Sequence, residues 1–72
     1  MKNCTIAISL YDEIFVSNFS IAGTTPEYVI ADEAFRLALM FAKTQIIAKY
    51  GYFDYNTFSK FMRDLEYSYT IE

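Results

Sequence analysis

A chain of 72 residues forms one domain at most, because a protein of this length buries only about 60% of the surface that its unfolded form exposes. The net charge of −3, with six scattered basic residues, argues against direct nucleic-acid binding, which needs clustered Lys and Arg. One cysteine and no histidine exclude an internal disulfide and a clustered soft-metal site, so we expect no metal and no cofactor. Seven Phe and seven Tyr must therefore supply much of the buried surface.

The chain opens with a strand pattern from Lys2 to Leu10. Apolar residues alternate with small ones along this stretch, which predicts a strand with one buried face. The buried set is Cys4, Ile6, Ile8 and Leu10. A break at 11–13 precedes a second alternating stretch, Ile14 to Ala22, in which Phe15, Phe19 and Ile21 share a face. The short connection predicts an antiparallel hairpin.

We do not expect the N-terminal stretch to be a secretory signal, because polar residues such as Thr5 and Asp12 interrupt it. No run approaches the roughly 18 apolar residues of a membrane span. We therefore expect a cytoplasmic protein with no membrane partner.

The longest helical periodicity covers Asp32 to Tyr50, and it has an unusually wide apolar face. Such a face needs cover from a sheet on one flank and a second helix on the other. The two flanks are Ile30, Ala34, Leu37, Phe41 and Ala48, and Ala31, Phe35, Ala38, Ala42 and Ile46. Gly51 suits the left-handed position that ends a helix.

The start of this helix is ambiguous. Thr25 as N-cap, with Pro26 in the first turn, would begin it early. That start places Glu27 in the apolar face and Val29 in the polar one, so the sequence favours Asp32 as the cap of a helix beginning at Glu33. Residues 27–30 would then be a short strand or an extended segment.

A second helix follows Asp54, a good N-cap, and its apolar residues recur at spacings of three and four. These are Tyr55, Phe58, Phe61, Met62 and Leu65. Residues 67–72 alternate again, which predicts a third strand that returns to the hairpin. The predicted fold is a single α+β domain over residues 1–72, in the order ββααβ with a three-stranded antiparallel sheet.

Catalysis finds little support in the sequence. The commonest general base is missing, and no glycine-rich loop or serine-centred elbow is present. The adjacent carboxylates of Asp12 and Glu13, and of Asp32 and Glu33, point apart on a strand or a helix, so we interpret them as turn and helix charges. Cys4, between apolar neighbours, is best interpreted as a buried structural thiol. We therefore do not expect an enzyme.

The polar side of the long helix carries an unexpected stripe, in which Arg36, Met40, Lys43 and Ile47 follow one another at steps of four, three and four. Two large apolar residues on adjacent turns, flanked by basic ones, are typical of a helix-mediated homodimer or partner contact. Two other interpretations stay open: the residues are singly exposed, or the N-terminal residues or the segment 27–30 cover them.

A second candidate surface lies around Gly51, where Tyr50, Tyr52, Phe53 and Tyr55 exceed what a turn between helices needs. Tyrosine is enriched at binding surfaces because it gives a large contact area at low entropic cost. The alternative is that Phe53 and Tyr55 close the helix end. Tyr67 and Tyr69 would join this surface if the last strand lay nearby.

These observations favour a non-catalytic protein-binding module, homodimeric and acting by occupying a surface on a larger macromolecule. Mobile elements such as phages use small, acidic, aromatic-rich chains of this kind as inhibitors of host machinery, including CRISPR effectors. This is an analogy of type, and the sequence indicates no family. The alternatives are a structural or regulatory subunit of a cellular complex and an acidic mimic of nucleic acid.

Overall fold

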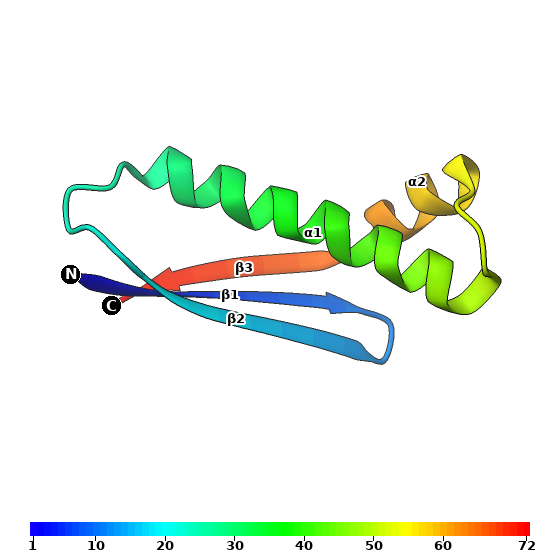
Figure 1. Cartoon of the computed structure of the whole chain (residues 1–72), viewed down its shortest axis with the longest axis horizontal. Helices are drawn as coiled ribbons and strands as arrows, with labels where there is room; N and C mark the ends of the chain where they lie inside the picture. Colours follow the sequence, from blue (N-terminus) through cyan, green and yellow to red (C-terminus); the bar gives the residue numbers. More distant parts are fainter.

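The computed structural model describes all 72 residues, and Figure 1 shows one sheet with both helices on the same side of it. In chain order the elements are β1 (Lys2–Leu10), β2 (Glu13–Ile21), α1 (Glu27–Tyr50), α2 (Tyr55–Asp64) and β3 (Glu66–Ile71). The strands are antiparallel in the order β2-β1-β3, so the first strand is central. The predicted ββααβ fold and the three-stranded sheet are confirmed.

The sheet has one apolar face that the helices cover and a second face that is mostly polar but also exposes Ile14 and Val16. Cys4 lies opposite Phe19 on β2 and Ile71 on β3, and the same alternation continues along β1. The four alternating residues of β1 that were predicted to be buried are all at most 2% exposed. On the other face, Thr5 lies opposite Asn18 and donates a hydrogen bond of 2.6 Å to its side-chain oxygen. No helix covers that second face (Figure 1).

Helix α1 packs on the apolar face along a ridge of small residues. Its buried residues are spaced four apart: Ile30, Ala34, Ala38, Ala42 and Ile46. Residues four apart form a ridge inclined to the helix axis, and alanine in the middle of that ridge lets the backbone approach the sheet closely. The buried ridge therefore combines members of both predicted flanks, whereas Phe35 and Ala48 are exposed.

Helix α1 lies over β1 and β3 rather than over the whole sheet. Figure 1 shows β3 next to the helix and β2 farthest from it, in agreement with the contacts that α1 makes. On the β3 side, Phe35 packs against Tyr67 at 6.4 Å between ring centroids. The inner face of β2 is therefore only partly covered.

Two of the three predicted helix caps, Gly51 and Asp54, are observed. Gly51 has φ 80°, and its backbone N–H donates to the Ile47 carbonyl at 2.9 Å, as expected for a left-handed helix end. The Asp54 carboxylate accepts hydrogen bonds from the backbone N–H and the hydroxyl of Thr57, so it caps α2. The pKa of Asp54 is lowered, first by the Thr57 hydroxyl and then by its N–H.

The prediction that α1 begins at Glu33 is wrong, because the helix begins at Glu27 directly after Pro26. The early start does expose Val29, as the pattern implied. Glu27 is accommodated because its carboxylate accepts a hydrogen bond of 3.0 Å from the Tyr69 hydroxyl on β3. This contact joins segments 42 residues apart, so the local pattern could not indicate it. Neither helix is long and apolar enough to cross a membrane.

Candidate protein-binding surfaces

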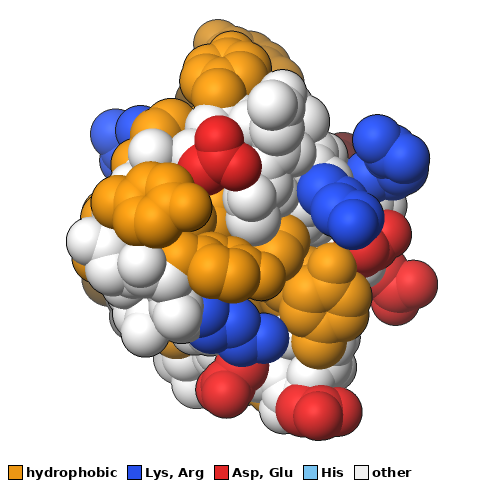
Figure 2. Space-filling model, turned by 90° about the vertical axis from the view of Figure 1, so that its right-hand side faces the viewer, with side chains coloured by type: hydrophobic (Ala, Val, Ile, Leu, Met, Phe, Trp, Pro, Cys, Tyr) orange, Lys and Arg blue, Asp and Glu red, His pale blue; other side chains and the backbone are white.

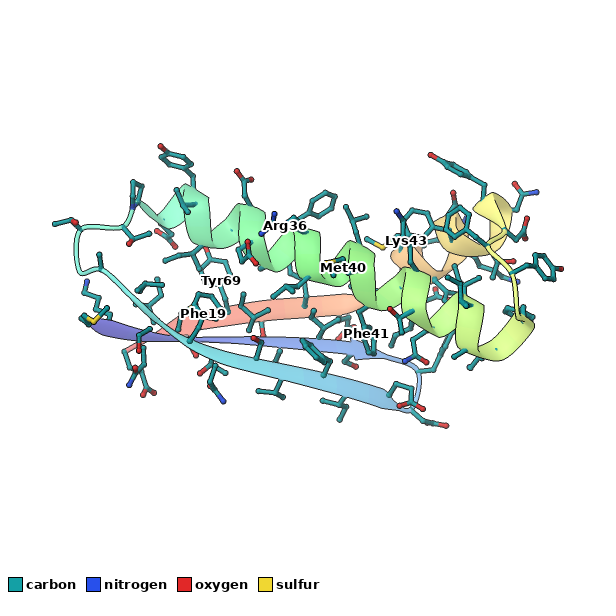
Figure 3. All side chains as sticks on the ribbon, in the orientation of Figure 1. Phe19, Arg36, Met40, Phe41, Lys43 and Tyr69 are labelled. Atoms are coloured by element: carbon teal, nitrogen blue, oxygen red, sulfur yellow. The ribbon has the colours of Figure 1, made fainter.

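The predicted stripe on α1 is open to solvent. Met40 is 58% exposed and Ile47 is 52% exposed, so the interpretation that other parts of the chain cover them is wrong. The structure nevertheless places Arg36, Met40 and Lys43 in different surroundings (Figure 3). Arg36 forms an ion pair with Glu33 one turn earlier. The ammonium of Lys43 lies 5.9 Å from the centre of the Phe53 ring, so the Lys43 side chain contacts the turn between the helices.

Met40 instead lines a hollow between α1 and β2. This hollow has a volume of about 350 Å³ and is lined also by Phe15, Leu37 and Phe41. The Phe15 and Phe41 rings lie 6.0 Å apart, and Figure 3 shows Phe41 directed from α1 toward the sheet. A second hollow of about 330 Å³, lined in part by Phe19, adjoins the first because Leu37 lines both. We call these two hollows together the β2 groove.

The predicted aromatic surface is exposed as well. Tyr50, Tyr52, Phe53 and Tyr55, which we call the aromatic end, are 52%, 65%, 42% and 72% exposed. Figure 2 shows this end of the molecule, where apolar side chains alternate with charged ones. The alternative of a closed helix end holds only in part, because Phe53 packs on Phe58 of α2 at 5.5 Å between ring centroids yet keeps a large open area.

Tyr67 and Tyr69 do not join the aromatic end. Tyr67 packs against Phe35 in the middle of α1, and Tyr69 reaches Glu27 at the start of α1. The hydrogen bond to Glu27 raises the pKa of Tyr69, because the donated proton is held by a carboxylate. Both tyrosines therefore attach β3 to the helix, and neither contributes to the predicted binding surface.

Tyr11 is the residue that sequence reasoning missed. It lies in the two-residue turn of the hairpin with φ 54°, a backbone conformation that is unusual for an aromatic residue. Its ring meets Phe61 edge-on at 5.5 Å, and the Lys49 ammonium lies 5.3 Å from its ring centre.

The Tyr11 hydroxyl also donates to Asp64 at 2.8 Å, which raises its pKa. These contacts hold the hairpin turn against the ends of both helices and offset the backbone strain. The only signal in the sequence was a large aromatic at a turn position.

The acidic residues do not converge on a common point. Asp12 and Glu13 lie at the exposed hairpin turn, and Glu33 is engaged by Arg36. No three acidic or cysteine side chains come together in a way that could hold a metal ion, and Cys4 is fully buried. Exposed apolar and aromatic side chains gather at the β2 groove and at the aromatic end.

Comparison with models of protein families, with curated protein sequences and with solved structures finds no match.

Proposed function

We propose that this chain is a non-catalytic protein-binding module that acts as a small inhibitor, by covering a surface on a larger macromolecule. The proposal rests on the aromatic end. Four large aromatic side chains are exposed there, in a chain that has only eleven buried residues. Isolated exposed apolar residues are ordinary, but a cluster of exposed rings is typical of an interaction site.

The chemistry of the aromatic end suits a protein surface. Tyrosine presents an apolar ring and a hydroxyl on a side chain with few rotamers, so it loses little entropy when it is buried in a complex. Lys43 over the Phe53 ring places a positive charge beside the apolar area. Aromatic anchors with a charged rim are the usual composition of the residues that dominate binding energy.

Inhibition by occlusion needs no moving part and no bound group. The molecule measures 40 × 20 × 17 Å, and the aromatic end closes one end of its long axis. A rod of this shape can insert its end into a cleft of a larger protein and block it. Small mobile-element inhibitors of host machinery, among them inhibitors of CRISPR effectors, act on this principle.

The proposal is tested by affinity capture from the native host with the intact chain and with a Tyr52→Ala, Phe53→Ala double variant. We expect the intact chain to retain a specific protein and the variant to lose it, with unchanged helical circular dichroism. Tyr28→Ala is the matched control, because Tyr28 is 70% exposed but lies in the first turn of α1, away from the aromatic end. Equal capture by the double variant would overturn the proposal.

A further inference from the structure

The outer edge of β2 is an unprotected sheet edge. The residues of β2 whose backbone groups point outward can be identified from the pair Asn3 and Glu72. These two residues exchange both backbone hydrogen bonds, at 2.9 and 2.8 Å. Odd-numbered residues of β1 therefore bond to β3 and even-numbered ones to β2, because bonding alternates along an antiparallel strand. Cys4 lies opposite Phe19, so the odd-numbered residues of β2 bond to β1. The even-numbered ones direct their N–H and C=O groups outward: Ile14, Val16, Asn18 and Ser20.

Natural sheets protect such an edge with lysine, proline, a bulge or a covering segment. Strand β2 has none of these. It is nine residues long, contains no Lys or Pro, and pairs with β1 without a skipped residue. Its only charge is Glu13 at the first position. The other edge strand, β3, is shorter and is packed against α1 through Tyr67 and Tyr69.

The β2 groove lies beside this open edge. Phe15 and Phe19 belong to β2 and form part of the groove, while Leu37, Met40 and Phe41 come from α1. A strand that paired with β2 would thus extend both the hydrogen-bonded sheet and the apolar face that the groove exposes. The same neighbour would form hydrogen bonds with the backbone groups and bury the apolar side chains.

The single chain also exposes more surface than a compact protein of its mass. Its accessible surface is 5055 Å², against about 4,600 Å² expected for 8.4 kDa. Its radius of gyration is 13.5 Å, against about 11 Å expected for a compact chain of this length. A stable interface of about 800 Å² per partner would take roughly a sixth of the surface. The β2 edge with its groove combines exposed apolar side chains with backbone groups that have no partner in the sheet.

We propose that two copies of this chain associate through the β2 edge, forming a continuous six-stranded sheet with the two β2 grooves joined above it. This inference goes beyond the proposed function, because it concerns a second surface of the molecule that is separate from the aromatic end. The two β2 strands run antiparallel about a two-fold axis at Ser17. Val16 then pairs with Asn18 of the second copy, and Ile14 with Ser20, so all the outward backbone groups find partners.

The strand is self-complementary in this register. On the groove face, Phe15 of each copy lies opposite Phe19 of the other copy. These two aromatic pairs lie on either side of the pair formed by the two Ser17 residues. Aromatic cross-strand pairs are among the more stabilising ones. Glu13 lies opposite Ile21 of the second copy, and the two Glu13 residues are separated by eight residues, about 27 Å along the strands. No like charges meet, and this favours a second copy over a strand of unrelated sequence.

The first experiment measures mass in solution and amide hydrogen exchange over a range of protein concentrations. We expect a mass twice that of the chain at high concentration. The N–H groups of the four outward residues of β2 should be protected only where the dimer forms, whereas those of the odd-numbered residues are protected throughout. A monomer at every concentration would overturn the proposal, and so would a dimer in which the outward amides exchange freely.

Two pairs of variants then identify the surface. Val16→Pro removes an outward N–H without touching the β1–β2 hydrogen bonds, so we expect a folded monomer; Val16→Thr keeps the N–H and should stay dimeric. Met40→Lys places a charge in the joined grooves and should also give a monomer. Ile47→Lys changes an equally exposed residue outside the groove and should have no effect. Loss of the dimer with Ile47→Lys but not with Val16→Pro would show a helix-mediated dimer and overturn the edge pairing.

The test of the dimer can be separated from the test of partner binding at the aromatic end. If Val16→Pro is monomeric and still captures the host partner, the dimer surface and the partner surface are separate, as inferred. If no partner is captured by any form but the concentration-dependent protection is found, the proposed inhibitor function fails while the edge dimer stands. Protection of the outward amides only after a different protein is added would show that a foreign strand, and not a second copy, occupies the edge.

Discussion

Helix α1 packs more closely against one edge of the sheet, β3, than against the other edge, β2. Toward β3, α1 is attached by the Phe35–Tyr67 ring contact and by the hydrogen bond from Tyr69 to Glu27. Toward β2, the Phe15–Phe41 contact bridges a groove. The cause is the inclined alanine ridge, which lets α1 settle closely over β1 and β3 and leaves β2 at the margin. One margin thus stabilises the monomer, and the other remains available to a neighbour.

The largest loss of stability is expected from a substitution that prevents the close packing of α1 on the sheet. Ala38 is fully buried in the ridge, so Ala38→Leu should destabilise the protein by about 1–3 kcal/mol through overpacking. Met40→Leu, in the exposed groove two residues away, should change stability by less than about 0.5 kcal/mol. Denaturant unfolding at a fixed protein concentration measures both. Equal effects would mean that the ridge is not the tight contact between helix and sheet.

A pair of half-exposed phenylalanines sharpens the contrast between the margins. Phe35→Ala and Phe15→Ala each remove a partly buried ring and should each cost about 1 kcal/mol in the monomer. The cost of Phe15→Ala should grow as protein concentration rises, because Phe15 also lies in the proposed dimer interface, whereas the cost of Phe35→Ala should not. Unfolding midpoints across a concentration series test this, and parallel behaviour of the two variants would contradict it.

The β3 margin should weaken in alkali. The pKa of Tyr69 is raised above its ordinary value of 10.0 by the hydrogen bond to Glu27, so folding favours the neutral phenol. Its contribution is complete below pH 10 and is lost as pH rises through the folded-state pKa. Tyr11, which bonds Asp64, should behave likewise. Tyrosinate absorbance should show two of the seven tyrosines titrating late, and Tyr69→Phe should remove one of them.

The smallest effect on stability is expected at the N-terminus of α2, away from both edges of the sheet. The pKa of Asp54 is lowered by its hydrogen bonds to Thr57, so its capping contribution is present above its ordinary value of 3.8 and is lost as pH falls through the folded-state pKa. Asp54→Asn keeps an oxygen acceptor but should remove this acid dependence. Thermal unfolding midpoints measured between neutral and acidic pH compare the two proteins, and identical pH profiles would contradict the capping role.

Much of the candidate site was predictable because exposure follows from local periodicity. Met40 and Ile47 fall outside the apolar ridge on any regular helix, and the residues around Gly51 lie beyond the reach of the sheet. The β2 groove was not predictable, because its existence depends on where α1 crosses the sheet. The role of Tyr11 was also hidden, since its partners Phe61 and Asp64 lie some fifty residues later in the chain.

The amino-acid pattern by itself determined which elements form and which face of β1 is buried, because alternation and four-residue spacing act through neighbours along the chain. Only the tertiary structure decided that α1 begins at Glu27, that Tyr69 holds that start, and that β2 is left uncovered. These features depend on how one rigid element is placed on another, and that placement is set by contacts between segments distant in sequence.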